Sequence, residues 1–139
     1  MRITVYTIEE ANRRLTEVRP RMETLVAQKR EYDRLEAQVG VLRVATHGAD
    51  AANPDALELR RVGEALQQLG ATIGEGLGAL RELGVVVKDL DSGLCDFYSL
   101  KGDRLVFLCW RVGEPEVGHW HALDDGFAGR RPLRGAELD

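Results

Sequence analysis

The sequence predicts an α+β fold, in which a long antiparallel helical hairpin precedes a small C-terminal antiparallel β-meander of three to four strands. Three observations support this fold class. Apolar residues recur at helical spacing before Gly84, and after it they alternate or occur in short β-rich runs. A breaker-rich segment at 46–53 divides the helical part in two. Short turn sequences separate the C-terminal runs, which is typical of neighbouring strands that pair antiparallel.

The first helix is predicted to begin after Thr7, because Thr7 and Glu10 have the spacing of a capping box. The preceding residues 2–6 form either a short strand or an extended lead-in. Steps of three and four then relate the apolar residues Ile8, Ala11, Leu15, Val18, Met22 and Leu25. Pro20 interrupts this series, and a proline in a helix interior costs about 3 kcal/mol. We therefore expect either a kink at Pro20 or a short first helix after which Pro20 opens a second.

The next helix is predicted to begin at Asn53 and Pro54, which resemble an N-cap followed by a proline at the first helical position. Its apolar positions are Leu59, Val62, Leu66, Leu69, Ile73, Leu77 and Leu80. A helix of about 30 residues would be roughly 45 Å long. Gly70, Gly74 and Gly78 lie four residues apart and form a bare stripe on it. The stripe indicates either a mobile C-terminal half or close packing against another helix, within the chain or across a dimer interface; the persistent leucine periodicity favours close packing.

Four strands are predicted after Gly84, at 85–90, 94–100, 104–112 and 117–123. The segment 124–139 is expected to be an irregular tail. Residues 1–139 would then form a single domain, with the helical hairpin over 7–83, its loop near 46–53 and the sheet over 85–123.

Composition and charge exclude several classes of protein. The chain has 139 residues, of which 44% are hydrophobic and 30% charged, so it can fold around a core without disulfide bonds. The net charge is −4 and no block of Lys and Arg occurs, which disfavours nucleic acid as a partner. No apolar run approaches the ~20 residues of a membrane span, and the first residues lack a signal peptide's apolar core. With only Cys95 and Cys109, a reducing cytoplasm is the expected location.

The opening "YTIEEANRRL" and the C-terminal segments "KDLDSGLCDF", "LCWRVGEPEVGHWH" and "DDGFAGRRPL" carry a family resemblance. Over nearly its whole length, the chain resembles a bacterial family known as domain-of-unknown-function family 2203. Its C-terminal motif residues are Gly93, Leu94, Asp96, Phe97, Leu108, Cys109, Trp110, Gly113, Glu114, Trp120, His121, Gly126, Phe127, Gly129 and Arg130. Cys95 stands where that family usually has an aliphatic residue, and His119 where it has an aromatic one. The resemblance implies an architecture and candidate residues, but no reaction.

Metal-binding residue types gather in the C-terminal strands. Alternation along the last strand places His119 and His121 on one face, which can present two imidazoles to one ion. The turn between the second and third strands decides which residue lies opposite Cys109. A two-residue turn would set Asp96 there, and a shift by one residue would set Cys95 there instead.

We predict a site for a divalent metal such as zinc, with the ligands Asp96, Glu114 and His121. Residues that could assist this site or bind an anion are Cys109, His119, Lys88 and Arg130, with Arg111 and Arg131 as further cations. No C-x-x-C or H-E-x-x-H motif supports the site. A buried histidine bonded to a nearby carboxylate would account for the same residues as part of the core.

The hypothesis preferred from the sequence is a non-enzymatic oligomeric assembly or interaction module. A homo-oligomer formed through the helices would cover an apolar stripe that is longer than the small sheet can bury. The alternative is a divalent-metal-binding protein or metal-dependent hydrolase, with its site at the C-terminal sheet. No membrane partner is expected, and catalytic residues are unassigned.

Overall fold

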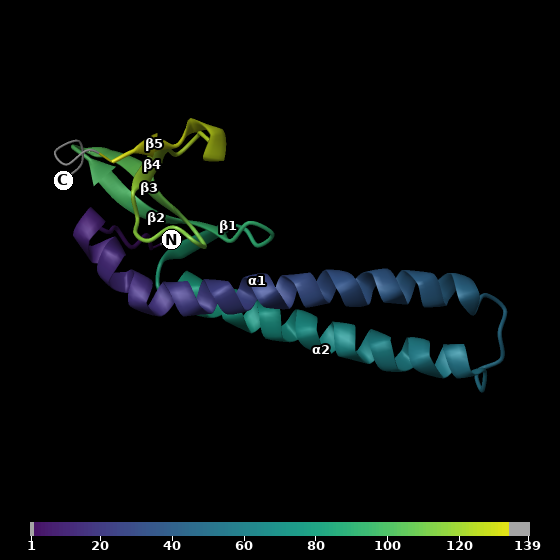
Figure 1. The fold of residues 1–139 in the computed structure, drawn as a ribbon. Coiled ribbons are helices and arrows are strands. Elements are labelled where there is room, and N and C mark those ends of the chain that lie inside the picture. Colours follow the sequence, from purple (N-terminus) through teal and green to yellow (C-terminus); the bar gives the residue numbers. More distant parts are fainter. Residues whose placement is uncertain (1, 134–139) are drawn as a thin grey trace.

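The computed structural model describes residues 2–133, in which a helical hairpin precedes a five-stranded antiparallel sheet (Figure 1). The helices are α1 (Ile8–Ala45) and α2 (Pro54–Glu82). The strands are β1 (Val85–Asp89), β2 (Leu94–Lys101), β3 (Arg104–Arg111), β4 (His119–Ala122) and β5 (Arg131–Pro132), with the 3-10 helix η1 (Phe127–Gly129) before β5. The predicted α+β class is confirmed. None of the helices within residues 2–133 combines the length and apolar character that a membrane crossing needs.

Both helices begin at the predicted caps. The Thr7 hydroxyl accepts a hydrogen bond from the Glu10 backbone N–H, and the Glu10 carboxylate accepts one from the Thr7 N–H. The Asn53 side chain caps α2, and Pro54 occupies its first turn, where a missing N–H costs no helical hydrogen bond. Each cap satisfies N–H groups that have no partner inside the helix.

Pro20 lies inside α1, so this region is one continuous helix and not two. Figure 1 shows the axis of α1 changing direction in its first part, as expected where a proline removes a helical hydrogen bond and crowds the preceding turn. The part before the bend lies against the sheet, and the rest runs away from the sheet beside α2. At the bend, Arg19 donates to the backbone carbonyls of Glu114 and Pro115 at 3.0 and 2.9 Å.

The glycine stripe of α2 does not mark a uniform close approach between the helices. A Cβ at Gly70 would lie 3.3 Å from a tyrosine ring of α1, but one at Gly74 or Gly78 would meet no neighbouring group within 4 Å among residues 2–133. The tightest approach is instead at Gly76, where a Cβ would lie 2.9 Å from Leu25 Cδ2. The expectation of close packing along the stripe is therefore wrong within the chain, because α1 packs against a different side of α2.

The sheet has the order β1-β2-β3-β4-β5, and each strand pairs antiparallel with its neighbour in sequence. Gly102, with φ +64°, and Asp103 form a two-residue turn, so Asp96 lies opposite Cys109. The first of the two predicted alignments is thus confirmed. The segment 124–139 is predicted to be irregular, but it contains β5. A strand of two residues is too short to show a periodic pattern in the sequence. The rest of that segment, 134–139, lies outside the described residues. Near the N-terminus, the lead-in makes a single parallel bridge between Val5 and Tyr98.

The main core lies between the helices and one face of the sheet, here called the inner face. Its buried strand residues are Val85, Cys95, Phe97, Val106, Leu108, Trp110 and Trp120, and its buried helix residues are Ala11, Leu15, Val18, Met22, Leu25, Ile73 and Leu80. A smaller cluster of Leu35, Val39 and Val62 joins the helices far from the sheet. Side chains alternate along a strand, so the residues between the inner-face positions point to the opposite, outer face.

Candidate metal centre

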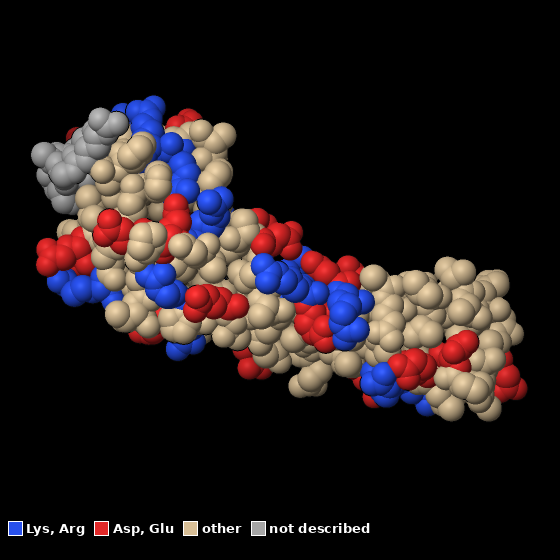
Figure 2. All heavy atoms as spheres, in the orientation of Figure 1, with Lys and Arg blue, Asp and Glu red and all other residues tan. Residues whose placement is uncertain are grey.

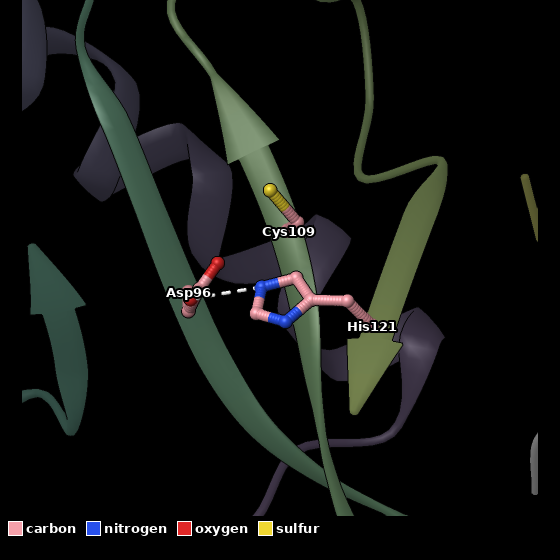
Figure 3. A group of neighbouring side chains, drawn as sticks. All are labelled: Asp96, Cys109 and His121. Carbon is pink, nitrogen blue, oxygen red and sulfur yellow. Dashed lines mark hydrogen bonds and ion pairs between the residues drawn. The ribbon is translucent and has the colours of Figure 1, made fainter. Parts of the chain in front are cut away.

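Asp96 on β2, Cys109 on β3 and His121 on β4 meet on the outer face of the sheet (Figure 3). One ligand atom from each lies within 4.8 Å of the others. We call these residues the three-residue cluster. Cys109 is paired with Asp96, and His121 is paired with Phe107, so the imidazole crosses β3 diagonally to reach β2. All three residues are buried, with exposed fractions of 0% for Asp96, 0% for Cys109 and 3% for His121.

Both nitrogens of the His121 ring are engaged. Nδ1 lies 2.8 Å from the Ala122 carbonyl oxygen, which can only accept, so Nδ1 carries a hydrogen and donates it. Nε2 lies 3.1 Å from Oδ2 of Asp96, and a single proton joins these two atoms. The second carboxyl oxygen, Oδ1, is buried and has no hydrogen-bond partner among residues 2–133. A buried polar atom without a partner is costly, so a further group at Oδ1 would be stabilising.

The protonation of the cluster opposes nucleophilic catalysis by Cys109. Burial raises the pKa of the Asp96 carboxyl, although the neighbouring His121 opposes this shift. Burial, and next the charge of Asp96, raises the pKa of the Cys109 thiol to about 12, so the thiol is neutral at physiological pH. His121 cannot act as its base, because both ring nitrogens already have partners. The arrangement is therefore not a Cys–His–Asp triad.

The same three side chains offer atom types that zinc accepts. A thiolate sulfur, an imidazole nitrogen and a carboxylate oxygen are all ordinary zinc ligands. A metal-binding histidine usually donates its other N–H to a carbonyl or carboxylate, and the bond from Nδ1 of His121 to Ala122 leaves Nε2 to face the ion. An ion would displace the thiol proton and the proton between Asp96 and His121. Three protein ligands leave one position of a tetrahedral shell for water or a ligand.

Cys95 belongs to the inner face, although it is adjacent to Asp96 in sequence. It is fully buried in the main core, opposite Trp110, where burial strongly raises the pKa of its thiol. Alternation along the strands thus places the two cysteines on opposite faces of the sheet. Only Cys109 can contribute to the three-residue cluster.

Glu114 lies apart from the three-residue cluster, in an ion-pair group beside it. Its Oε1 accepts hydrogen bonds from Nη2 of Arg130 and from the backbone N–H of Arg111, both at 2.8 Å. Its Oε2 lies 3.6 Å from Nδ1 of His119, which is paired with Cys109 across β3 and β4. Burial raises the pKa of Glu114, but these hydrogen bonds outweigh it and hold the pKa below its ordinary value. The carboxylate predicted as a metal ligand is therefore engaged by other groups.

The remaining cations of the prediction stack on aromatic rings. Nζ of Lys88 lies 4.6 Å from the ring centroid of Phe107. Cζ of Arg111 and Cζ of Arg130 lie 5.3 and 4.7 Å from the ring centroid of Phe127. Of the predicted anion-binding residues, Arg111 and Arg130 thus meet at Phe127, whereas Lys88 stacks on a different ring. Among these cations, Arg130 is the one whose side chain pairs with Glu114.

Two features of the cluster differ from what the sequence predicts. Cys109 was predicted as an accessory residue, yet it lies beside Asp96 and His121, and Glu114 does not. The alternation of the third strand, which groups Phe107, Cys109 and Arg111, could have identified its face. The Ala122 carbonyl that orients His121 is a backbone group, and no residue pattern indicates it.

A family model described as "Uncharacterized conserved protein (DUF2203)" matches residues 4–133. The matched range contains both helices, all five strands and the whole three-residue cluster. No curated protein and no solved structure matches the chain.

Proposed function

From the premise that the chain belongs to the DUF2203 family of uncharacterised conserved proteins, we propose that it binds a divalent metal ion, with zinc held by the three-residue cluster. The observation that carries this proposal is the convergence of three different ligand types from three strands within 4.8 Å. The unpartnered Oδ1 of Asp96 supports it, because an ion would stabilise this buried oxygen. The bond from Nδ1 of His121 to Ala122 supports it as well, because it presents Nε2 toward the ion.

The two buried cysteines provide a matched pair of variants. Cys95→Ala and Cys109→Ala each remove one fully buried thiol from adjacent strands, but only Cys109 faces the cluster. Wild-type protein purified without an affinity tag and reconstituted with zinc is expected to hold one ion per chain. Cys95→Ala should retain this ion, and Cys109→Ala should bind zinc at least about tenfold more weakly, as measured by competition with a chromophoric chelator.

Stability in chelator gives a second readout, because an ion bound to the folded state stabilises it. A chelator should lower the unfolding temperature of wild type and of Cys95→Ala, and should leave that of Cys109→Ala unchanged. Wild-type protein without stoichiometric zinc, or equal zinc affinity in the two variants, would overturn the proposal. Hydrolysis is the activity to assay on the zinc-loaded protein, because three protein ligands leave the position at which zinc hydrolases bind water.

Self-association is a second candidate function, and the far end of the helical hairpin favours it. Val41, Val44 and Leu57 are 69%, 80% and 51% exposed there. Figure 2 shows an uncharged area on the upper side of this end of the hairpin, with charged side chains along its lower side. Contact between hairpin ends of two copies would bury these residues. Light scattering should then give a mass above that of one chain at micromolar concentration, and a clean monomer would contradict this candidate.

A further inference from the structure

Three buried polar side-chain atoms on the outer face of the sheet have no hydrogen-bond partner among residues 2–133. They are Oδ1 of Asp96, Nδ1 of His119 and Nε of Arg130. A fourth such atom, in Trp120, belongs to a residue of the main core. Folded proteins pair nearly all buried polar groups, so unpaired atoms concentrated in one region indicate a place where an external group binds.

Arg130 and His119 are brought together by Glu114. Nη2 of Arg130 donates to Oε1 of Glu114 at 2.8 Å, whereas Nδ1 of His119 lies 3.6 Å from Oε2, which is beyond hydrogen-bond distance. A guanidinium has five N–H donors in a rigid plane, so one carboxylate contact leaves others available. The Arg130 side chain is only 11% exposed, and its Nε is fully enclosed.

The guanidinium of Arg130 is held in place and cannot rotate freely to find another acceptor. Its Cζ lies 4.7 Å from the ring centroid of Phe127, and Cζ of Arg111 lies 5.3 Å from the same centroid. Stacking on one side and the ion pair with Glu114 on the other fix the direction of the Nε–H bond. Arg111 lies on the same ring as Arg130, so two cations and the one carboxylate of Glu114 meet here, which favours an anionic ligand.

We propose that Arg130, through its Nε–H, and His119 form a subsite for an oxyanion, a phosphate or carboxylate group, beside the three-residue cluster. Arg130 supplies a charged donor, and His119 supplies the second polar contact through Nδ1. The His119 side chain is 32% exposed, so its displacement would open the route by which an anion reaches the two enclosed nitrogens. This inference goes beyond metal binding, because the subsite needs no ion. Since His119 is paired with Cys109, the anion would lie next to the proposed metal.

The test is a titration of chelator-treated protein with inorganic phosphate and, in a separate arm, with acetate. The Nε–H resonance of Arg130 should shift on titration. The ion that binds with the higher affinity, phosphate or acetate, identifies the ligand as a phosphoryl or a carboxylate compound. Arg130→Lys keeps the charge but has no Nε–H, so it should weaken binding at least about tenfold, as expected for one lost hydrogen bond to a charged group. The adjacent Arg131→Lys is the control and should stay within about twofold.

Two results would overturn this inference. One is the absence of any shift of the Arg130 Nε–H resonance at about 10 mM phosphate or acetate, well above the roughly millimolar Kd expected for a small ion. The other is equal weakening by Arg130→Lys and Arg131→Lys, which would indicate attraction to general positive charge. The wild-type resonance is informative even if a variant fails to fold. Since the titration is done without metal, its failure is separate from a failure of the zinc proposal, which the cysteine pair tests.

Discussion

Glu114 joins parts of the chain that lie far apart in sequence. Its backbone carbonyl accepts hydrogen bonds from Arg19 of α1 at 3.0 Å and from the Trp110 indole at 3.1 Å. Its carboxylate accepts from Arg130, which precedes β5. A residue in one turn thereby holds the bend of α1, the end of β3 and the C-terminal segment together. Because its Oε1 already accepts two hydrogen bonds, Glu114 is better suited to positioning Arg130 than to binding an ion.

The pKa of Glu114 predicts a pH-dependent contribution to stability. Its folded-state pKa lies below the ordinary value of 4.5, so the carboxylate stabilises the fold above about pH 4.5. This contribution is lost as the pH falls through the lower folded-state value. Glu114→Gln should lower the free energy of unfolding by about 1–2 kcal/mol at pH 7, and by much less at pH 3, in urea titrations.

The exposed neighbour Glu116 provides the control for this experiment. Glu116→Gln should change the free energy of unfolding by less than about 0.5 kcal/mol at either pH, because surface substitutions of this kind have small effects. A difference between wild type and Glu114→Gln that stayed constant from pH 7 to pH 3 would show that the charge of Glu114 is not what stabilises the fold.

Sequence patterns predict which side chains of a strand share a face better than they predict contacts made in a turn. Asp96 and His121 were predicted as ligands because strand alternation and a two-residue turn determine which side chains share a face. The 112–118 turn that contains Glu114 has no such period, so the partner of Glu114 could not be predicted. The sequence left two alignments of β2 with β3 open, so Cys109 was expected only as an accessory residue.

At the scale of elements, the sequence predicted the starts of both helices and the order of the first four strands. Caps and prolines act locally, through N–H groups within one turn, so a single sequence reveals them. The contact between the helices is different, because it depends on which side of α2 faces α1. Gly76 makes the close approach to Leu25, and Gly74, only two residues away, faces open space.

This difference between the two glycines can be measured. Gly74→Ala should raise the free energy of unfolding by about 0.5–1 kcal/mol, because alanine has the higher helix propensity and its Cβ meets nothing within 4 Å. Gly76→Ala gains the same propensity but sets a Cβ 2.9 Å from the buried Leu25 side chain, so it should leave the protein no more stable than wild type. Urea unfolding measures both variants. Equal stabilisation by the two substitutions would contradict the observed helix contact.

For the whole molecule, the two ends differ in how much apolar surface they bury. The sheet end contains the main core, formed by residues of both helices and four of the strands. The far end of the hairpin is held by the cluster of Leu35, Val39 and Val62, with partly buried neighbours. Figure 1 shows that the sheet does not extend along this part of the helices. Local opening costs least where few apolar contacts must be broken, so we expect the hairpin to open from its far end.

Amide hydrogen exchange should therefore show a gradient along both helices. At low protein concentration, amides in 36–45 and 54–60 should exchange faster than those in 11–26 and 73–80, because the latter lie over the main core. If hairpin ends of two copies associate, protection in 36–45 and 54–60 should increase with concentration, since association stabilises the closed form by mass action. The strand amides in 94–100 serve as the internal control and should show no such dependence. Uniform protection along both helices at the lowest concentration would mean that the small cluster suffices to hold the hairpin closed, and the reason for expecting association there would be lost.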